Sequence, residues 1–139
     1  MKTIATAAIA LSAVLGTAAF ANEPKAFVCK FTQGAAARYD EAEWSVKMLN
    51  EKLDLTFAGL NSQQGKAQLI GNAGASDVRF WKGAWTWNFV EVTDVGNVMT
   101  TTVFEASGGK DYPAVHSRHT SVAGEPFPSQ YRGTCSAKS

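Results

Sequence analysis

The chain has 139 residues, with 13 basic and 12 acidic side chains and a formal net charge of +1. This length favours a single domain, and the balanced charge argues against a strongly basic nucleic-acid binder and an acidic disordered tail. Aromatic residues make up 11% of the chain, which is enough for a hydrophobic core without a structural metal ion.

The first 21 residues have the pattern of a cleavable export signal. Lys2 provides the positive start, residues 4–18 are an almost uninterrupted apolar run, and Ala19-Phe20-Ala21 matches an A-x-A cleavage site. The run is shorter than the roughly 20 residues of a membrane-spanning helix. We therefore expect a signal peptide at residues 1–21 and one domain at residues 22–139. We also expect the mature chain to have no membrane span and to lie in the periplasm or outside the cell.

Cys29 and Cys135 are the only two cysteines and lie near the two ends of the expected mature chain. An oxidising compartment lets such a pair form a disulfide, and only one pairing is possible. Redox-active pairs are typically C-x-x-C, and a metal site would need further ligands. The sequence therefore predicts a structural disulfide.

Short runs of β-branched and aromatic residues recur along the chain, separated by Gly, Asn, Asp, Ser or Pro. This pattern is typical of an all-β protein. The predicted strands cover residues 26–32, 53–60, 66–70, 77–93, 98–105, 112–120 and 127–135. Gly83 is expected to bend or split the longest of these runs.

Residues 43–49 allow two interpretations. Trp44, Val46 and Met48 alternate as they would on a strand. Asp40 is also a plausible cap for a short helix, because a glutamate follows it three residues later. We favour the strand and keep the helix as the alternative.

Seven or eight short strands joined mostly by tight turns favour an antiparallel meander. Closing such a sheet removes its exposed edges. We therefore expect a small closed or nearly closed antiparallel barrel, with a two-sheet sandwich as the alternative. A disulfide between Cys29 and Cys135 fits the barrel, because the first and last strands of an up-and-down barrel are neighbours.

Four aromatic residues fall at odd positions of the run 77–93 and form what we call the aromatic stripe: Trp81, Trp85, Trp87 and Phe89. A small barrel either packs such side chains as its core or lines a pocket with them. Glu91 follows on the same face and is suited to bind a polar ligand head or act as a general acid. These five residues are the predicted ligand-binding candidates.

His116, Ser117, Arg118 and His119 form the most conspicuous polar cluster. Residues three apart on a strand face opposite ways, so the two histidines are not expected to share a metal ion. Ser117 lacks a turn that would present a nucleophile. His116 and Arg118 share a face and are candidates for binding a partner's carboxylate. We expect no catalytic set, no metal and no cofactor; the alternative is a hydrolase or isomerase that uses Glu91, His116 or His119.

Four stretches share their layout with a known family: Phe27-Val28-Cys29, Ala37-Arg38-Tyr39, Phe80-Trp81-Lys82-Gly83 and Cys135. They resemble the periplasmic lysozyme inhibitors of the MliC type over about a third of the mature chain. The resemblance implies a small barrel joined by a disulfide, with Lys82 in the place of the family's inhibitory lysine. Residues 74–78 depart from that family's Ser-Gly-x-x-Tyr loop, so its Ser and Tyr are not carried over.

Three further stretches are similar to small exported proteobacterial proteins without an assigned role: residues 100–104, 114–119 and 128–135. This likeness implies a family and no particular function. Taken together, the sequence predicts a monomeric, non-enzymatic exported protein that binds a small apolar or amphipathic ligand, or a protein partner through Lys82, His116 or Arg118. The alternatives are a lysozyme-inhibitor-like protein and a structural accessory protein of the envelope.

Overall fold

The computed structural model describes residues 23–106 and 110–139. The expected signal peptide at residues 1–21 lies outside the described residues, as does most of a turn expected at residues 107–111. All regular elements of the described residues are strands: β1 (Ala26–Asp40), β2 (Glu43–Leu49), β3 (Leu53–Asn61), β4 (Lys66–Gly71), β5 (Gly74–Lys82), β6 (Thr86–Val92), β7 (Val98–Phe104), β8 (Asp111–His119), β9 (Ser121–Val122), β10 (Glu125–Pro126) and β11 (Ser129–Lys138).

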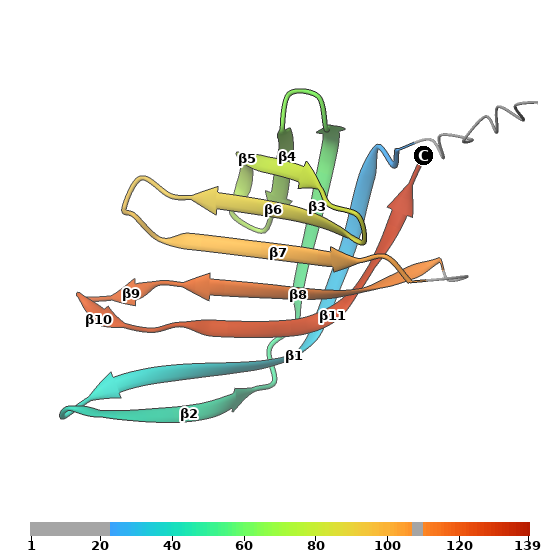
Figure 1. Cartoon of the computed structure of the whole chain (residues 1–139). Coiled ribbons are helices and arrows are strands. Elements are labelled where there is room, and N and C mark those ends of the chain that lie inside the picture. Colours follow the sequence, from blue (N-terminus) through green and yellow to red (C-terminus); the bar gives the residue numbers. More distant parts are fainter. Residues whose placement is uncertain (1–22, 107–109) are drawn as a thin grey trace, which may run out of the picture.

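Eight of the strands form a closed antiparallel barrel, and β2 extends its sheet beyond the barrel (Figure 1). The neighbours are, in order, β11, β8, β7, β6, β5, β4, β3 and β1, and the pairing of β1 with β11 closes the ring. The two-residue strands β9 and β10 form a separate small hairpin. The predicted all-β meander barrel is thus confirmed over the predicted sandwich alternative.

Strand β1 is twice as long as predicted, because a bulge lets it continue past Phe31. Its register against β11 shifts between Phe31 and Gln33. Such a bulge bends a strand and reverses which side chains face inward. Before the bulge the odd-numbered residues face the core, whereas after it the buried residues are Gly34 and Ala36. The second half of β1 keeps its pairing with β11 as far as Ala36, and on its other side β2 takes the place of β3.

Residues 43–49 form strand β2, so the alternative of a short helix is wrong. A two-residue turn at Glu41 and Ala42 joins β1 to β2, and both residues have positive φ angles, 48° and 66°. These angles are those of a type I′ turn, whose twist matches that of two antiparallel strands. A hairpin therefore forms here although neither residue is a glycine or an asparagine.

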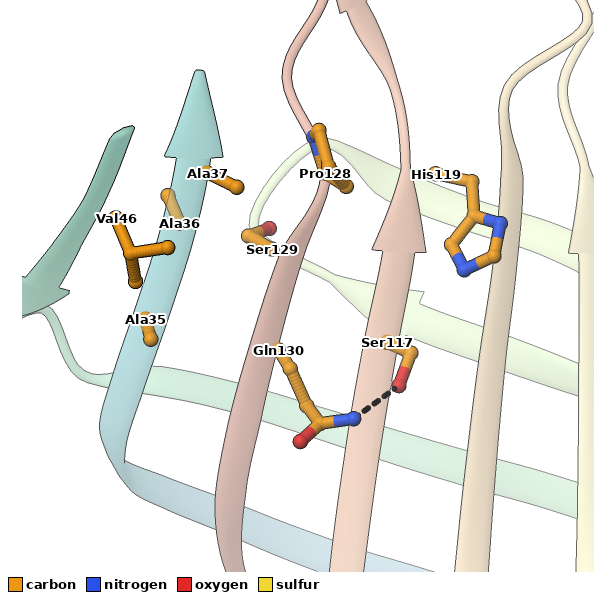
Figure 2. Close-up of a pocket in the computed structure, with 9 residues that line it drawn as sticks. All are labelled: Ala35, Ala36, Ala37, Val46, Ser117, His119, Pro128, Ser129 and Gln130. Carbon is orange, nitrogen blue, oxygen red and sulfur yellow. Dashed lines mark hydrogen bonds between the residues drawn. The ribbon is translucent and has the colours of Figure 1, made fainter. Parts of the chain in front are cut away.

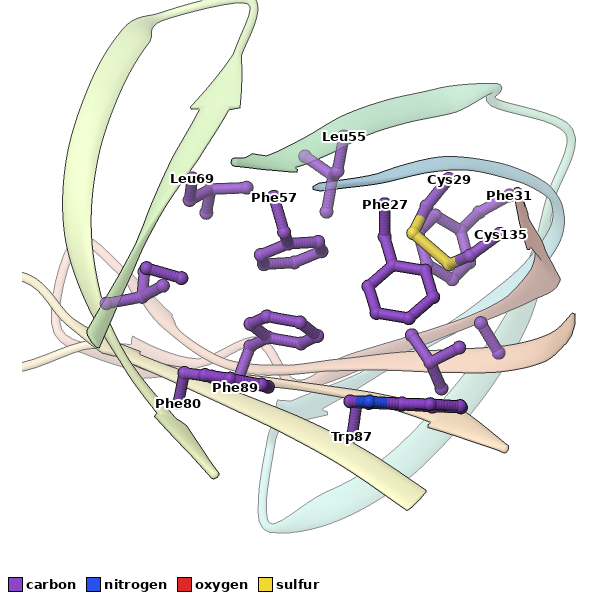
Figure 3. Packing of buried hydrophobic residues seen from close by; sticks show 14 of the residues in the cluster. Phe27, Cys29, Phe31, Leu55, Phe57, Leu69, Phe80, Trp87, Phe89 and Cys135 are labelled. Carbon is purple, nitrogen blue, oxygen red and sulfur yellow. A yellow bond between two sulfur atoms is a disulfide. The ribbon is translucent and has the colours of Figure 1, made fainter. Parts of the chain in front are cut away.

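The interior of the barrel is filled with aromatic rings (Figure 3). Phe89 stacks on Phe57 with ring centroids 4.0 Å apart and on Phe80 at 5.0 Å, and the Phe27 and Trp87 rings are 5.1 Å apart. Such aromatic contacts add to the free energy gained by burying apolar area. The middle of the barrel is therefore solid core.

The prediction of one continuous aromatic stripe is wrong. Trp87 and Phe89 point into the barrel, whereas Trp81 and Trp85 are 49% and 76% exposed. The run is two strands, β5 and β6, separated by a short connection that begins at Gly83. Directly paired residues of antiparallel strands share a face, and Phe80 pairs with Phe89. β5 therefore turns its even-numbered side chains inward and β6 its odd-numbered ones. The stripe is therefore divided between the core and the outer surface.

Candidate functional site

A cavity of about 480 Å³ opens at one end of the barrel, and we call it the mouth cavity. Side chains from six strands line it, among them Leu53 and Leu55 of β3, Leu69 of β4, Ser76 of β5, Glu91 of β6, Met99 of β7, and His116 and Arg118 of β8. The turn between β4 and β5 forms part of its rim.

One wall of the mouth cavity is apolar. Leu55 and Leu69 are only 7% and 8% exposed, and Leu53 lies beside them at the rim. These leucines follow the period-2 alternation of β3 and β4, which turns every second side chain inward. The sequence predicted a strand at residues 53–60, but no pattern in it indicated that these leucines would line a cavity.

Glu91 enters the mouth cavity from β6. It follows Trp87 and Phe89 on the inward face, as predicted, and it is half-buried. The hydroxyl of Ser76 donates a hydrogen bond to Oε1 of Glu91. This bond orients the carboxylate and leaves its second oxygen as an acceptor for other groups.

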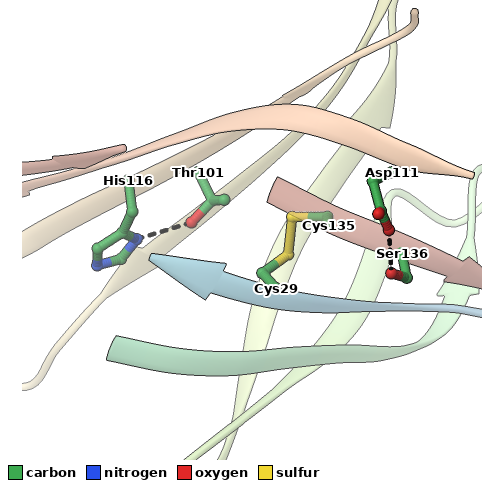
Figure 4. The surroundings of a disulfide bond; sticks show 6 residues. All are labelled: Cys29, Thr101, Asp111, His116, Cys135 and Ser136. Atoms are coloured by element: carbon green, nitrogen blue, oxygen red, sulfur yellow. Dashed lines mark hydrogen bonds between the residues drawn. A yellow bond between two sulfur atoms is a disulfide. The ribbon is translucent and has the colours of Figure 1, made fainter. Parts of the chain in front are cut away.

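His116 lies inside the barrel with 3% of its surface exposed. β8 turns Ala114 and His116 inward, so the partner-binding candidate His116 is not exposed to a protein partner. The Nδ1 atom of His116 is 2.8 Å from Oγ1 of Thr101 on β7 (Figure 4). Burial, and to a smaller extent the positive charge of Arg118, lower the pKa of His116 from 6.5 to about 4. The imidazole is therefore neutral at pH 7.

Arg118 lies two residues beyond His116 on the same face, as predicted, and it lines the mouth cavity. Its guanidinium carbon is 5.9 Å from the centre of the Tyr131 ring. Glu91 pairs with Met99, and Met99 pairs with Arg118, across three neighbouring strands. Two strand spacings separate the acidic from the basic residue by roughly 10 Å. The rim thus carries one negative and one positive group with an apolar side chain between them.

His119 faces the outside of the barrel, opposite to His116, as predicted for residues three apart on a strand. Ser117 faces the outside as well. They line a shallow outer hollow with Val46 of β2 and Gln130 of β11 (Figure 2). Nε2 of Gln130 donates a hydrogen bond of 3.2 Å to Oγ of Ser117. Over residues 23–106 and 110–139, no three His, Cys, Asp or Glu side chains are grouped as metal ligands.

Lys82 is exposed at the end of β5 that is remote from the mouth cavity. Its Nζ atom lies 5.3 Å from the centre of the Trp87 ring, the geometry of a cation–π contact. Trp81 precedes Lys82 on the outer face. The three predicted partner-binding residues are thus divided, with Lys82 at one end of the barrel and His116 and Arg118 at the other.

Comparison of the chain with protein-family models, curated proteins and solved structures found no match. In the part of the chain that the structure describes, no helix has the length and apolar character needed to cross a bilayer.

Proposed function

We propose that this protein is an exported, non-enzymatic binding protein whose mouth cavity holds a small amphipathic molecule with an anionic head group. The observation that carries this proposal is the position of Arg118, which is half-buried beside an apolar wall inside the mouth of the barrel. A guanidinium that is partly removed from water favours an anionic partner, and it binds carboxylates through paired hydrogen bonds.

The shape and polarity of the mouth cavity support such a ligand. Its volume of about 480 Å³ falls in the range of small-molecule sites, which are mostly apolar with a few polar groups. The leucines would contact the apolar body of the ligand, and Arg118 would hold its head group. Glu91 accepts hydrogen bonds, so a hydroxyl or amide of the ligand would lie near it. The neutral ring of His116 adds polarity without a second positive charge.

The disulfide supports the proposed location. Bonds of this kind persist in oxidising compartments such as the periplasm or the medium. The bond between Cys29 and Cys135, together with the pattern of residues 1–21, fits a chain that is exported before it folds.

Calorimetric titration tests the proposal with decanoate and an aromatic carboxylate as probes, each compared with its uncharged alcohol. We expect the carboxylates to bind about 10- to 100-fold more tightly than the alcohols, because a hydrogen bond to a charged group contributes about 1.5 to 3 kcal/mol. The substitution Arg118→Met should remove this preference. Arg132→Met, at an exposed position of β11, is the matched control. Equal affinity of acids and alcohols, or an equal loss in both variants, would overturn the proposal.

A protein partner is a second candidate, and the exposed side chains around Lys82 favour it. Trp81 and Trp85 are exposed beside this lysine, and exposed aromatic residues are frequent at protein interfaces. Together with the resemblance to lysozyme inhibitors, this arrangement predicts inhibition of a cell-wall lysozyme. Lys82→Ala should weaken the inhibition, whereas Lys66→Ala, at an exposed position of β4, should not. Undiminished inhibition by Lys82→Ala would show that this lysine does not contribute to the inhibition.

A further inference from the structure

The hairpin of β1 and β2 carries a row of uncovered apolar side chains, which we call the β2 row. It consists of Trp44, Val46 and Met48, which are 58%, 73% and 62% exposed. Their partners across the hairpin are Tyr39, Ala37 and Ala35. The rings of Tyr39 and Trp44 lie 5.1 Å apart, and Figure 2 shows Val46 beside Ala35 and Ala37 on the outer side of the sheet. Alternating apolar and polar residues are the pattern of a strand with one buried face, yet this face is open to water.

The backbone of β2 is also open along one side. Among the described strands β2 pairs with β1 alone, and it ends the order of the sheet (Figure 1). In a two-residue hairpin the amide after the turn, here that of Glu43, bonds back to the partner strand. Antiparallel ladders alternate the direction of their backbone groups. The amides and carbonyls of Trp44, Val46 and Met48 therefore point to the open edge.

An open edge with an apolar face is a template for another strand. Proteins commonly protect such edges with a lysine, because pairing would bury or oppose its charge. β2 does carry Lys47 on its polar face, but it also carries Glu43 on that same face. An incoming strand that places a negative charge opposite Lys47 and a positive charge opposite Glu43 would neutralise this protection.

A second copy of β2 meets that requirement in one register. If two β2 strands pair antiparallel about a two-fold axis at Ser45, Glu43 of each copy lies opposite Lys47 of the other. The same register places Trp44 opposite Val46 of the other copy. These two residues have the edge-directed backbone groups, so they form the hydrogen-bonded pairs of the ladder. Shifting the axis to Val46 would instead place Lys47 opposite Ser45 and lose both ion pairs.

We propose that the protein forms a two-fold symmetric dimer by antiparallel pairing of β2 with β2 of a second copy, with Ser45 on the axis. Closed two-fold contacts are the commonest way in which soluble chains associate with themselves. The pairing joins the two hairpins into one continuous sheet and gives each Trp44 an apolar neighbour across the interface. This proposal is independent of the ligand proposed for the mouth cavity, because the two sites share no residue.

Sedimentation velocity on the purified, disulfide-bonded protein tests the dimer between about 1 and about 500 µM, the range in which weak self-association is measurable. We expect a species of twice the mass of one chain to accumulate as concentration rises. Glu43→Lys and Lys47→Glu, each alone, place like charges opposite each other at both ends of the ladder. Each should weaken the dimer about tenfold or more, since like charges directly opposite are destabilising.

Combining Glu43→Lys with Lys47→Glu in one chain restores opposite charges in this register alone, so the double variant should regain the dimer. The matched control is Lys66→Glu, which reverses an exposed charge on β4 and should leave association unchanged. Melting temperatures near that of the unchanged protein would show that the variants fold. A monomer at every concentration, as expected from the sequence, or a dimer insensitive to the charge reversals, would overturn the proposal.

Discussion

Cys29 of β1 lies directly opposite Cys135 of β11, in the one pair of strands that closes the barrel, and a disulfide joins them. Both cysteines are fully buried, and Figure 4 shows the bond between the two strands. The covalent link and the closing hydrogen-bond ladder thus hold the same two segments together, 106 residues apart in the sequence.

Removing this bond should lower the free energy of unfolding. The substitution of both cysteines by alanine, or reduction of the bond, frees a loop of this length in the unfolded chain, which corresponds to about 4 to 5 kcal/mol. Denaturant unfolding with and without reductant measures the difference. The doubly substituted protein is the control, since reductant should leave its unfolding midpoint unchanged. Equal stability of the oxidised and reduced protein would contradict the prediction.

His116 should make the protein less stable as the pH falls from about 6.5 towards 4. In the unfolded chain the histidine takes up a proton near its usual pKa of 6.5, whereas the folded protein resists protonation until about pH 4. The unfolded state therefore binds more protons in this window, and the loss amounts to about 3 kcal/mol at its lower end. Unfolding free energies measured between pH 7 and 4 should show a smaller slope for His116→Gln than for the unchanged protein.

The titration of the His116 ring can also be followed directly. In an NMR titration the ring protons of His116 should shift with a midpoint well below 6.5. A midpoint near 6.5 would show that the ring is not held neutral by its surroundings.

Phe89 and Trp85 should differ strongly in their contribution to stability, although both were predicted on one stripe. Phe89 is buried between two other rings, so Phe89→Ala should cost about 3 to 5 kcal/mol. Trp85 is largely exposed, so Trp85→Ala should change stability by less than about 0.5 kcal/mol. Thermal unfolding of both variants checks this, and similar losses would contradict the division of the stripe.

Gly133 should not tolerate a side chain, because β1 approaches it closely beside the bulge. A Cβ atom there would collide with the carbonyl oxygen of Lys30 and would lie 2.7 Å from Cα of Phe31. These are backbone atoms, so Gly133→Ala should destabilise the protein by about 3 kcal/mol. Gly71→Ala is the control, since its Cβ would meet only a Leu55 methyl at 3.5 Å. Equal stability of the two variants would contradict the close approach.

Much of the fold could be predicted because alternation is a local signal. The strands at 53–60, 66–70 and 98–105 appear close to their predicted bounds, since each has turn residues at both ends and one apolar face. Closure of the barrel followed from the number of strands and the positions of the two cysteines. Alternation and turn residues are local in the sequence, and the pair of cysteines is the one long-range relationship that the prediction of closure used.

The errors arose where the chain changes the face that it turns inward. The connection at Gly83 reverses the alternation, so a period-2 pattern continued through it placed Trp81 on the same face as Trp87 and Phe89. The mouth cavity was missed for a different reason. Leu55, Glu91 and Arg118 meet only because the barrel brings β3, β6 and β8 around one opening, and no local pattern encodes that meeting.

The long strand β1 also constrains when this protein can fold. It pairs with β3 on one side and with β11, the last strand of the chain, on the other. When a chain emerges amino terminus first, from a ribosome or through a membrane, β1 therefore lacks a partner strand on its β11 side until β11 has emerged. Long-range pairing of this kind makes folding slow and leaves strand edges exposed in the interval. The barrel can therefore close only after β11 has emerged.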